Sequence, residues 1–72
     1  MQWNLIKERK TNNETQEEVA KILGISTAAY ASKEKGDTQF KSNEMFLLSR
    51  HYNKKIEEIF LPTKYTIRKQ TN

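Results

Sequence analysis

Few side chains in this sequence have the reactivity or the spacing that catalysis or metal binding requires. His51 is the single histidine and there is no cysteine, so a metal centre or a Ser-His-Asp arrangement is not expected. The acidic and basic residues are spread along the chain, without a glycine-rich phosphate loop or a converging acid–base pair. We therefore expect a protein that is not an enzyme and needs no metal or other cofactor, with His51 a partly exposed helix residue.

The positive charge of the chain favours a nucleic acid as the kind of ligand. The formal net charge is +4, but residues 1–62 hold ten of the 13 Lys and Arg residues against all nine Asp and Glu residues. The other three cations, Lys64, Arg68 and Lys69, lie in the last ten residues. Most of the net charge is therefore in a basic tail, which is expected either to be solvated or to touch phosphates.

The apolar residues recur with the period of helices, and no segment alternates like a strand. A first helix of about three turns, starting near Trp3, should end at the turn-forming pair Asn12-Asn13. The residues TQEE, which begin at Thr15, are a capping box for a second helix. The buried side of this helix is predicted to consist of Val19, Ala20, Ile22 and Leu23.

Glycine and serine set the limits of the next elements. Gly24 should end the second helix, because a residue with positive φ costs least as glycine. Ser26 is a good N-cap for a third helix that runs to about Lys35, and Gly36 stops it. A loop then leads to a fourth helix.

This fourth helix is predicted to start at Ser42 or Asn43 and to end at Asn53. Its apolar side should contain Met45, Leu48 and Tyr52, widened by Phe46 or Leu47. A short fifth helix lies in KKIEEIF, where Ile56, Ile59 and Phe60 come together.

The expected fold is all-α, a compact five-helix domain over residues 1–62. Pro62 prevents the fifth helix from continuing. Residues 63–72 form a separable basic tail, in which Tyr65 and Ile67 could pack as a strand-like arm or mediate self-association. No apolar run approaches the roughly 18 residues that would cross a bilayer and no signal peptide is evident, so we expect a soluble, intracellular protein.

The second and third predicted helices together have the pattern of a helix-turn-helix. This motif needs a small residue where the two helices cross, a glycine at the turn, and apolar residues that hold the second helix at a steep angle. Ala20 and Gly24 meet the first two requirements. The apolar residues that meet the third are Val19, Leu23, Ile25 and Tyr30. An ordinary helical hairpin would not require all these positions at once.

Several stretches resemble the Cro/C1-type, or XRE-type, helix-turn-helix regulators. They are TQEEVAKILGIS, Tyr30, Lys33-Glu34, Gly36, Phe40 and the closing IEEIF. The form YASKEKGDTQF is similar to small repressors and Cro-like proteins from temperate phages of Gram-positive bacteria, and the short length is similar to a Cro or a modulator of repression. The resemblance covers about residues 3–61 and implies a lambda-repressor-like DNA-binding domain that works in the cytoplasm of a bacterial host.

The resemblance also implies roles for individual residues. Arg9 and Glu34 stand where the family often has an arginine and a glutamate that pair between the first and third helices, although two independent surface charges are the alternative. Gln16 stands where a family glutamine meets a DNA phosphate at a helix N-terminus. The following loop and helix of the family touch the DNA backbone at positions that are here Lys41, Ser42 and Asn43.

The third helix has little with which to read bases. The positions predicted to point outward are Thr27, Ala28, Ala31, Ser32 and Lys35. Bidentate recognition of guanine or adenine uses Arg, Lys, Asn or Gln, and here only the lysine has that reach. The two hydroxyls can make single hydrogen bonds and the alanine methyls can touch thymine methyls, so discrimination between sequences should be modest.

Three departures from the family pattern argue against tight, autonomous DNA binding. Glu14 stands where an apolar residue commonly precedes TQ, and Glu8 replaces a frequent leucine. Lys33 replaces the usual apolar residue of the third helix, and its alkyl stem is expected to lie over the core with its ammonium outside.

Two functions follow from these observations. The chain could be a Cro-like repressor that docks residues 26–35 in the major groove of an operator as a homodimer, acting on DNA alone. It could instead be a modulator of repression, or antirepressor, that acts with the CI-type repressor of the phage in its lysis–lysogeny switch and uses Ala28 and Ala31 as a protein contact surface. We favour the reading in which the protein works together with the repressor. A membrane or a small-molecule substrate is not expected as a partner.

Overall fold

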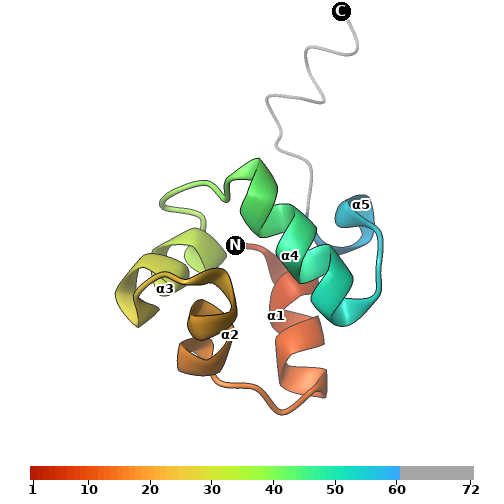
Figure 1. The fold of residues 1–72 in the computed structure, drawn as a ribbon, viewed down its shortest axis with the longest axis horizontal. Helices are drawn as coiled ribbons and strands as arrows, with labels where there is room; N and C mark the ends of the chain where they lie inside the picture. The colour runs from red at the N-terminus through yellow and green to blue at the C-terminus, as the bar shows by residue number, and fades with distance from the viewer. Residues whose placement is uncertain (61–72) are drawn as a thin grey trace, which may run out of the picture.

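Five helices make up the computed structural model, which describes residues 1–60 (Figure 1). They are α1 (Trp3–Thr11), α2 (Gln16–Leu23), α3 (Thr27–Lys35), α4 (Ser42–Tyr52) and α5 (Ile56–Ile59). Residues 1–60 contain no strand, so the predicted all-α fold is confirmed. The predicted domain limit at residue 62 and the proposed roles of the tail fall outside the described residues.

The helices begin and end where the sequence signals predict. The Thr15 hydroxyl accepts a hydrogen bond from the Glu18 amide at 3.1 Å, and the Glu18 carboxylate accepts one from the Thr15 amide at 2.8 Å. Gly24 ends α2 with φ of +73°, and Asn53 ends α4 with φ of +55°. The capping box and the left-handed helix ends are therefore confirmed.

One hydrophobic core joins all five helices and the loop before α4. Its buried members are Leu5, Val19, Ala20, Tyr30, Phe40, Leu48, Tyr52, Ile59 and Phe60. The Phe40 ring lies edge-on between the Tyr30 ring, with a centroid separation of 6.0 Å, and the Phe60 ring, at 5.1 Å. Phe40 thus connects α3 with the residue that follows α5.

Three predicted core positions are wrong. Ile22 is 38 % exposed, Leu47 is 41 % exposed and Phe46 is 63 % exposed. On α4 the buried positions recur every four residues, at 44, 48 and 52, which places residues 46 and 47 on the outer side of the helix. The inner position at the start of α4 is taken by Glu44, which the apolar pattern could not indicate.

The packing leaves α3 at one end of the molecule. α3 packs mainly against α2, whereas α5 packs against α1 and α4. In Figure 1, α3 lies at the left and α5 at the right, on opposite sides of the bundle. The outer side of α3 is therefore not covered by any other described helix.

Candidate nucleic-acid interface

Residues 24–26 connect α2 and α3 as the turn of a helix-turn-helix. The Ile25 amide donates to the Ala20 carbonyl at 3.0 Å, which closes the turn back onto α2. The Ser26 hydroxyl accepts from the Ala29 amide at 3.1 Å and so caps α3. Ala20 is buried where the helices pack, as the motif requires, since a larger side chain would force the two helices apart.

The face of α3 that the sequence predicts to point outward is open at its two ends and partly covered in its middle. Thr27, Ala28 and Lys35 are exposed, while Ala31 and Ser32 are half-buried. The opposite face carries Tyr30 and Glu34, both buried. The division of α3 into an inner and an outer face is therefore as predicted, although Ala31 and Ser32 lie toward its edge.

Glu34 is the centre of a hydrogen-bond network that joins α3 to α1 and α2. Its carboxylate accepts from Arg9 Nε at 2.8 Å and from Arg9 Nη2 at 3.1 Å, a two-pronged contact that is almost fully buried. It also accepts from Gln16 Nε2 at 2.9 Å and from the Tyr30 hydroxyl at 2.7 Å. The predicted pairing of Arg9 with Glu34 is present in the structure, and the network fixes the orientation of α3 on the bundle.

The network holds Glu34 in its ionised form. Burial by itself would raise the pKa of this carboxyl, but the hydrogen bonds from Arg9, Tyr30 and Gln16 outweigh burial and place the pKa below its ordinary value of 4.5. Burial and the contact with the Glu34 carboxylate raise the pKa of Tyr30, so its hydroxyl remains a donor.

This lowered pKa predicts the sign of the acid dependence of stability. Because the pKa of Glu34 is lower in the folded chain than in the unfolded one, its contribution is complete above the unfolded value and is lost as the pH falls through the folded value. We expect the free energy of unfolding in urea to fall between about pH 5 and about pH 3. Glu34→Gln should be less stable at neutral pH but should lose less on acidification. An equal loss in both proteins would contradict the assignment.

The predicted phosphate contacts lie around α3 on two other helices. Gln16 is the first residue of α2 and is half-buried, with one amide N–H used on Glu34. Lys41, Ser42 and Asn43 are all exposed at the start of α4. The fold therefore leaves these three side chains accessible, and their contact with DNA remains a proposal.

Lys33 differs from its expected position. Its ammonium does not lie outside the core but contacts Glu44 Oε1 on α4 at 2.6 Å, and the two side chains are only 12 % and 5 % exposed. A lysine at a position that the family usually fills with an apolar residue is tolerated because a buried carboxylate from the next helix neutralises it. The sequence showed the lysine but gave no signal for its partner.

A comparison with known protein families matches almost the whole of the five-helix domain. The HTH_3 family model, described as helix-turn-helix, matches residues 5–59. The chain belongs to this XRE-type helix-turn-helix family. No curated protein and no solved structure gives a significant match. The match identifies this helix-turn-helix protein as a DNA-binding transcriptional regulator, and members of the family are generally not enzymes.

Glu14 of this helix-turn-helix protein is held by α4 and not presented at the DNA-binding motif. Its carboxylate accepts from the Tyr52 hydroxyl at 2.7 Å and contacts His51 Nε2, and its carbonyl accepts from Arg9 Nη1 at 3.0 Å. Burial and this contact with the carboxylate raise the pKa of Tyr52. The replacement of the usual apolar residue thus makes a polar link between the α1–α2 loop and the end of α4.

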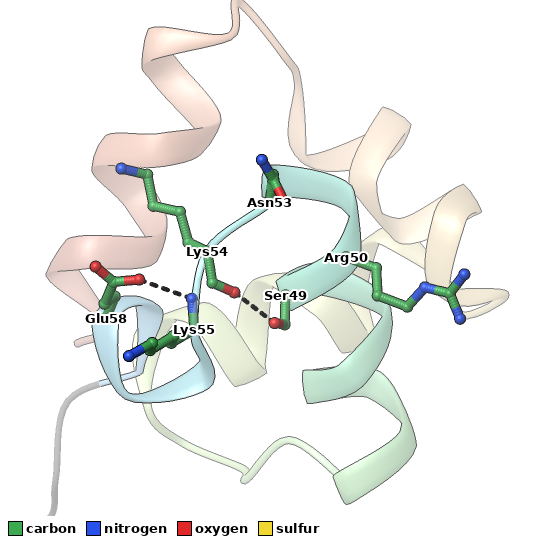
Figure 2. A pocket seen from close by; sticks show the side chains of 6 residues that line it. All are labelled: Ser49, Arg50, Asn53, Lys54, Lys55 and Glu58. Carbon is green, nitrogen blue, oxygen red and sulfur yellow. Dashed lines mark hydrogen bonds between the residues drawn. The ribbon is translucent and has the colours of Figure 1, made fainter.

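A shallow hollow near the α4–α5 connection does not form a second candidate site. It is lined by Ser49, Arg50, Asn53, Lys54, Lys55 and Glu58. Figure 2 shows Arg50 directed away from Lys54 and Lys55, so the cations do not converge on one ligand. Residues 1–60 also contain no cluster of side chains suited to a metal ion and no helix long and apolar enough to cross a membrane.

Proposed function

We propose that this protein is a Cro-like or modulator-type regulator of a phage lysis–lysogeny switch, and that it acts with a CI-type repressor through α3. The observation that supports this proposal most is the composition of the uncovered face of α3. That face carries the small side chains of Thr27, Ala28, Ala31 and Ser32, the last two half-buried, and a single long one, Lys35.

Small side chains suit contact with another helix better than base recognition. Alanine and serine let a second helix approach closely, whereas strong discrimination between bases needs long hydrogen-bonding side chains. Lys35 is itself 3.9 Å from the Asp37 carboxylate, and both are well exposed, so part of its charge is offset close by. A partner repressor would supply the base contacts that α3 lacks.

A second candidate is an autonomous repressor that binds its operator as a homodimer. It is favoured by the exposure of Lys41, Ser42 and Asn43 at the start of α4, where side chains and helix amides are suited to phosphates. In this function α3 enters the major groove, and Gln16 adds a phosphate contact at the start of α2.

An NMR titration distinguishes the two candidates. Isotope-labelled protein is titrated with a duplex that contains the phage operator, and separately with the N-terminal domain of the CI-type repressor. We expect the repressor domain, without DNA, to shift the amide signals of Thr27, Ala28, Ala31 and Ser32. Shifts with the duplex alone, unchanged when the repressor domain is added, would contradict the modulator function and support the autonomous repressor.

A further inference from the structure

The ion pair between Lys33 and Glu44 joins the motif helix to the helix that follows it. Lys33 lies in the last turn of α3 and Glu44 in the first turn of α4, and their side chains meet at 2.6 Å with little exposure to solvent. The ammonium also lies 6.0 Å from the centroid of the buried Phe40 ring. This pair therefore crosses the interior side of the α3–α4 loop, close to the core.

Glu44 has a second partner at the point where α4 begins. The same oxygen that contacts Lys33 accepts a hydrogen bond from the Lys41 backbone amide at 2.8 Å. One carboxylate thus connects the cation on α3 with the backbone of the residue that caps α4. If Lys33 and Glu44 shift relative to each other, the start of α4 shifts with them.

We propose that Lys33 and Glu44 form a clamp that positions the start of α4 relative to α3 when the protein binds DNA. The clamp would hold Lys41, Ser42 and Asn43 within reach of the DNA phosphates while the outer face of α3 faces the major groove. This inference rests on the DNA contacts at the start of α4 that were proposed above for the second candidate function. Lys33 and Glu44 are positioning residues, because both are buried and neither is placed to touch DNA.

The clamp also neutralises the negative charge of Glu44 at the N-terminus of α4. A carboxylate in the first turn of α4 would repel a phosphate bound at that helix end if it were unpaired. Burial would raise the pKa of Glu44, but the hydrogen bonds from Lys33 and from the Lys41 amide lower it below its ordinary value, so the group is ionised and needs a cation. Lys33 supplies the contacting cation from within the fold, while Lys41, whose charge also lowers the pKa of Glu44, stays exposed and accessible to DNA.

The test compares the number of phosphate contacts in proteins of equal net charge. Lys33→Met with Glu44→Gln removes one cation and one anion, and the glutamine carbonyl can still accept from the Lys41 amide. Binding is measured by fluorescence anisotropy with a labelled duplex of mixed sequence, about 20 base pairs long, over a series of salt concentrations. The slope of log K against log salt changes by about 0.9 for each phosphate contact.

We expect the double variant to stay folded and to show a shallower slope by about one to two, because removal of a buried ion pair as a unit is often nearly neutral for stability. The matched control is Lys54→Met with Glu8→Gln. It removes an ion pair, with Lys54 Nζ 3.5 Å from Glu8 Oε2, on the side of the bundle away from α3. This control should keep the wild-type slope. Lys33→Arg keeps the cation and should also keep the wild-type slope of log K against log salt. Glu44→Asp keeps both charges but is too short to hold both partners, and it gives the same test if the double variant does not fold.

A wild-type slope in the Lys33→Met, Glu44→Gln double variant and in Glu44→Asp would overturn the proposal, as would a shallower slope in the Lys54–Glu8 control. Failure of the wild type to bind the duplex at low salt would overturn the proposed DNA contacts and the clamp together. Binding by the wild type with no effect of the clamp variants would overturn the clamp alone.

Discussion

Replacement of Arg9 by methionine is expected to lower the free energy of unfolding by about 3 kcal/mol. The Arg9 and Glu34 side chains are only 11 % and 4 % exposed, so the substitution leaves a carboxylate inside the fold without its cation. The hydrogen bonds from Gln16 and Tyr30 remain, but neither donor carries a charge. A domain of this size has a total stability of only about 3–5 kcal/mol from its core, so the variant should retain only about 0–2 kcal/mol and lie close to its unfolding transition at 25 °C.

Circular dichroism and urea unfolding measure this effect, and the chain offers two informative comparisons. Arg50→Met removes an exposed arginine that forms no ion pair with any residue from 1 to 60, and its effect should stay within about 0.5 kcal/mol. Arg9→Met combined with Glu34→Gln also removes the stranded charge and should recover much of the loss. A stability of Arg9→Met equal to that of Arg50→Met would show that the network does not hold the fold together.

Local signals in the sequence predicted the elements and the motif of this protein. The Thr15–Glu18 capping box, the turn at Gly24 and the Ser26 cap depend on neighbours within a few residues, so they can be read from the chain alone. The Arg9–Glu34 pair spans 25 positions in the sequence and was predicted only because the family resemblance indicated it.

The Lys33–Glu44 ion pair and the Tyr52–Glu14 hydrogen bond could not be predicted, because each needs a partner from a distant part of the sequence. Glu44 and Glu14 are hydrophilic residues, and the spacing of the apolar residues either gives no prediction for their positions or predicts that they are exposed. Their burial becomes favourable only once Lys33 and Tyr52 are brought beside them by tertiary packing.

The misplaced apolar residues of α4 have a related cause. Helical spacing alone allows either Met45, Leu48 and Tyr52 or a broader face with Phe46 and Leu47 to be buried. Packing selects the narrower face, in which Glu44 pairs with Lys33 of α3 and Leu48 and Tyr52 join the core. The exposure of Phe46 follows from the arrangement of neighbours and not from its hydrophobicity.

The second large effect is expected from Ala28→Glu on binding through α3, both to the CI-type repressor proposed as its partner and to a duplex. Ala28 is the second residue of α3 and is exposed, so a glutamate there should not disturb the fold, and its charge is favourable near a helix N-terminus. Against a closely packed partner helix, however, the added carboxylate would be buried without a cation, and against DNA it would face phosphates and base acceptors. We expect affinity for a duplex to fall about 10- to 100-fold, since an unpaired charge at an interface costs about 1–3 kcal/mol.

Asn4→Glu is a matched control for this substitution. Asn4 is likewise exposed and is the second residue of α1, so the same negative charge is added at the same position of a helix outside the motif. Both variants should keep the thermal stability of the wild type by circular dichroism. The remaining difference between them is the surface on which the charge lies.

The most direct test of the claim that α3 is the working surface is the affinity of these two variants for the N-terminal domain of the CI-type repressor and for a duplex, each measured by anisotropy at one low salt concentration. The account predicts a loss of about tenfold or more for Ala28→Glu and a change of less than about threefold for Asn4→Glu. Equal affinities of Ala28→Glu and Asn4→Glu, with both proteins folded, would contradict it.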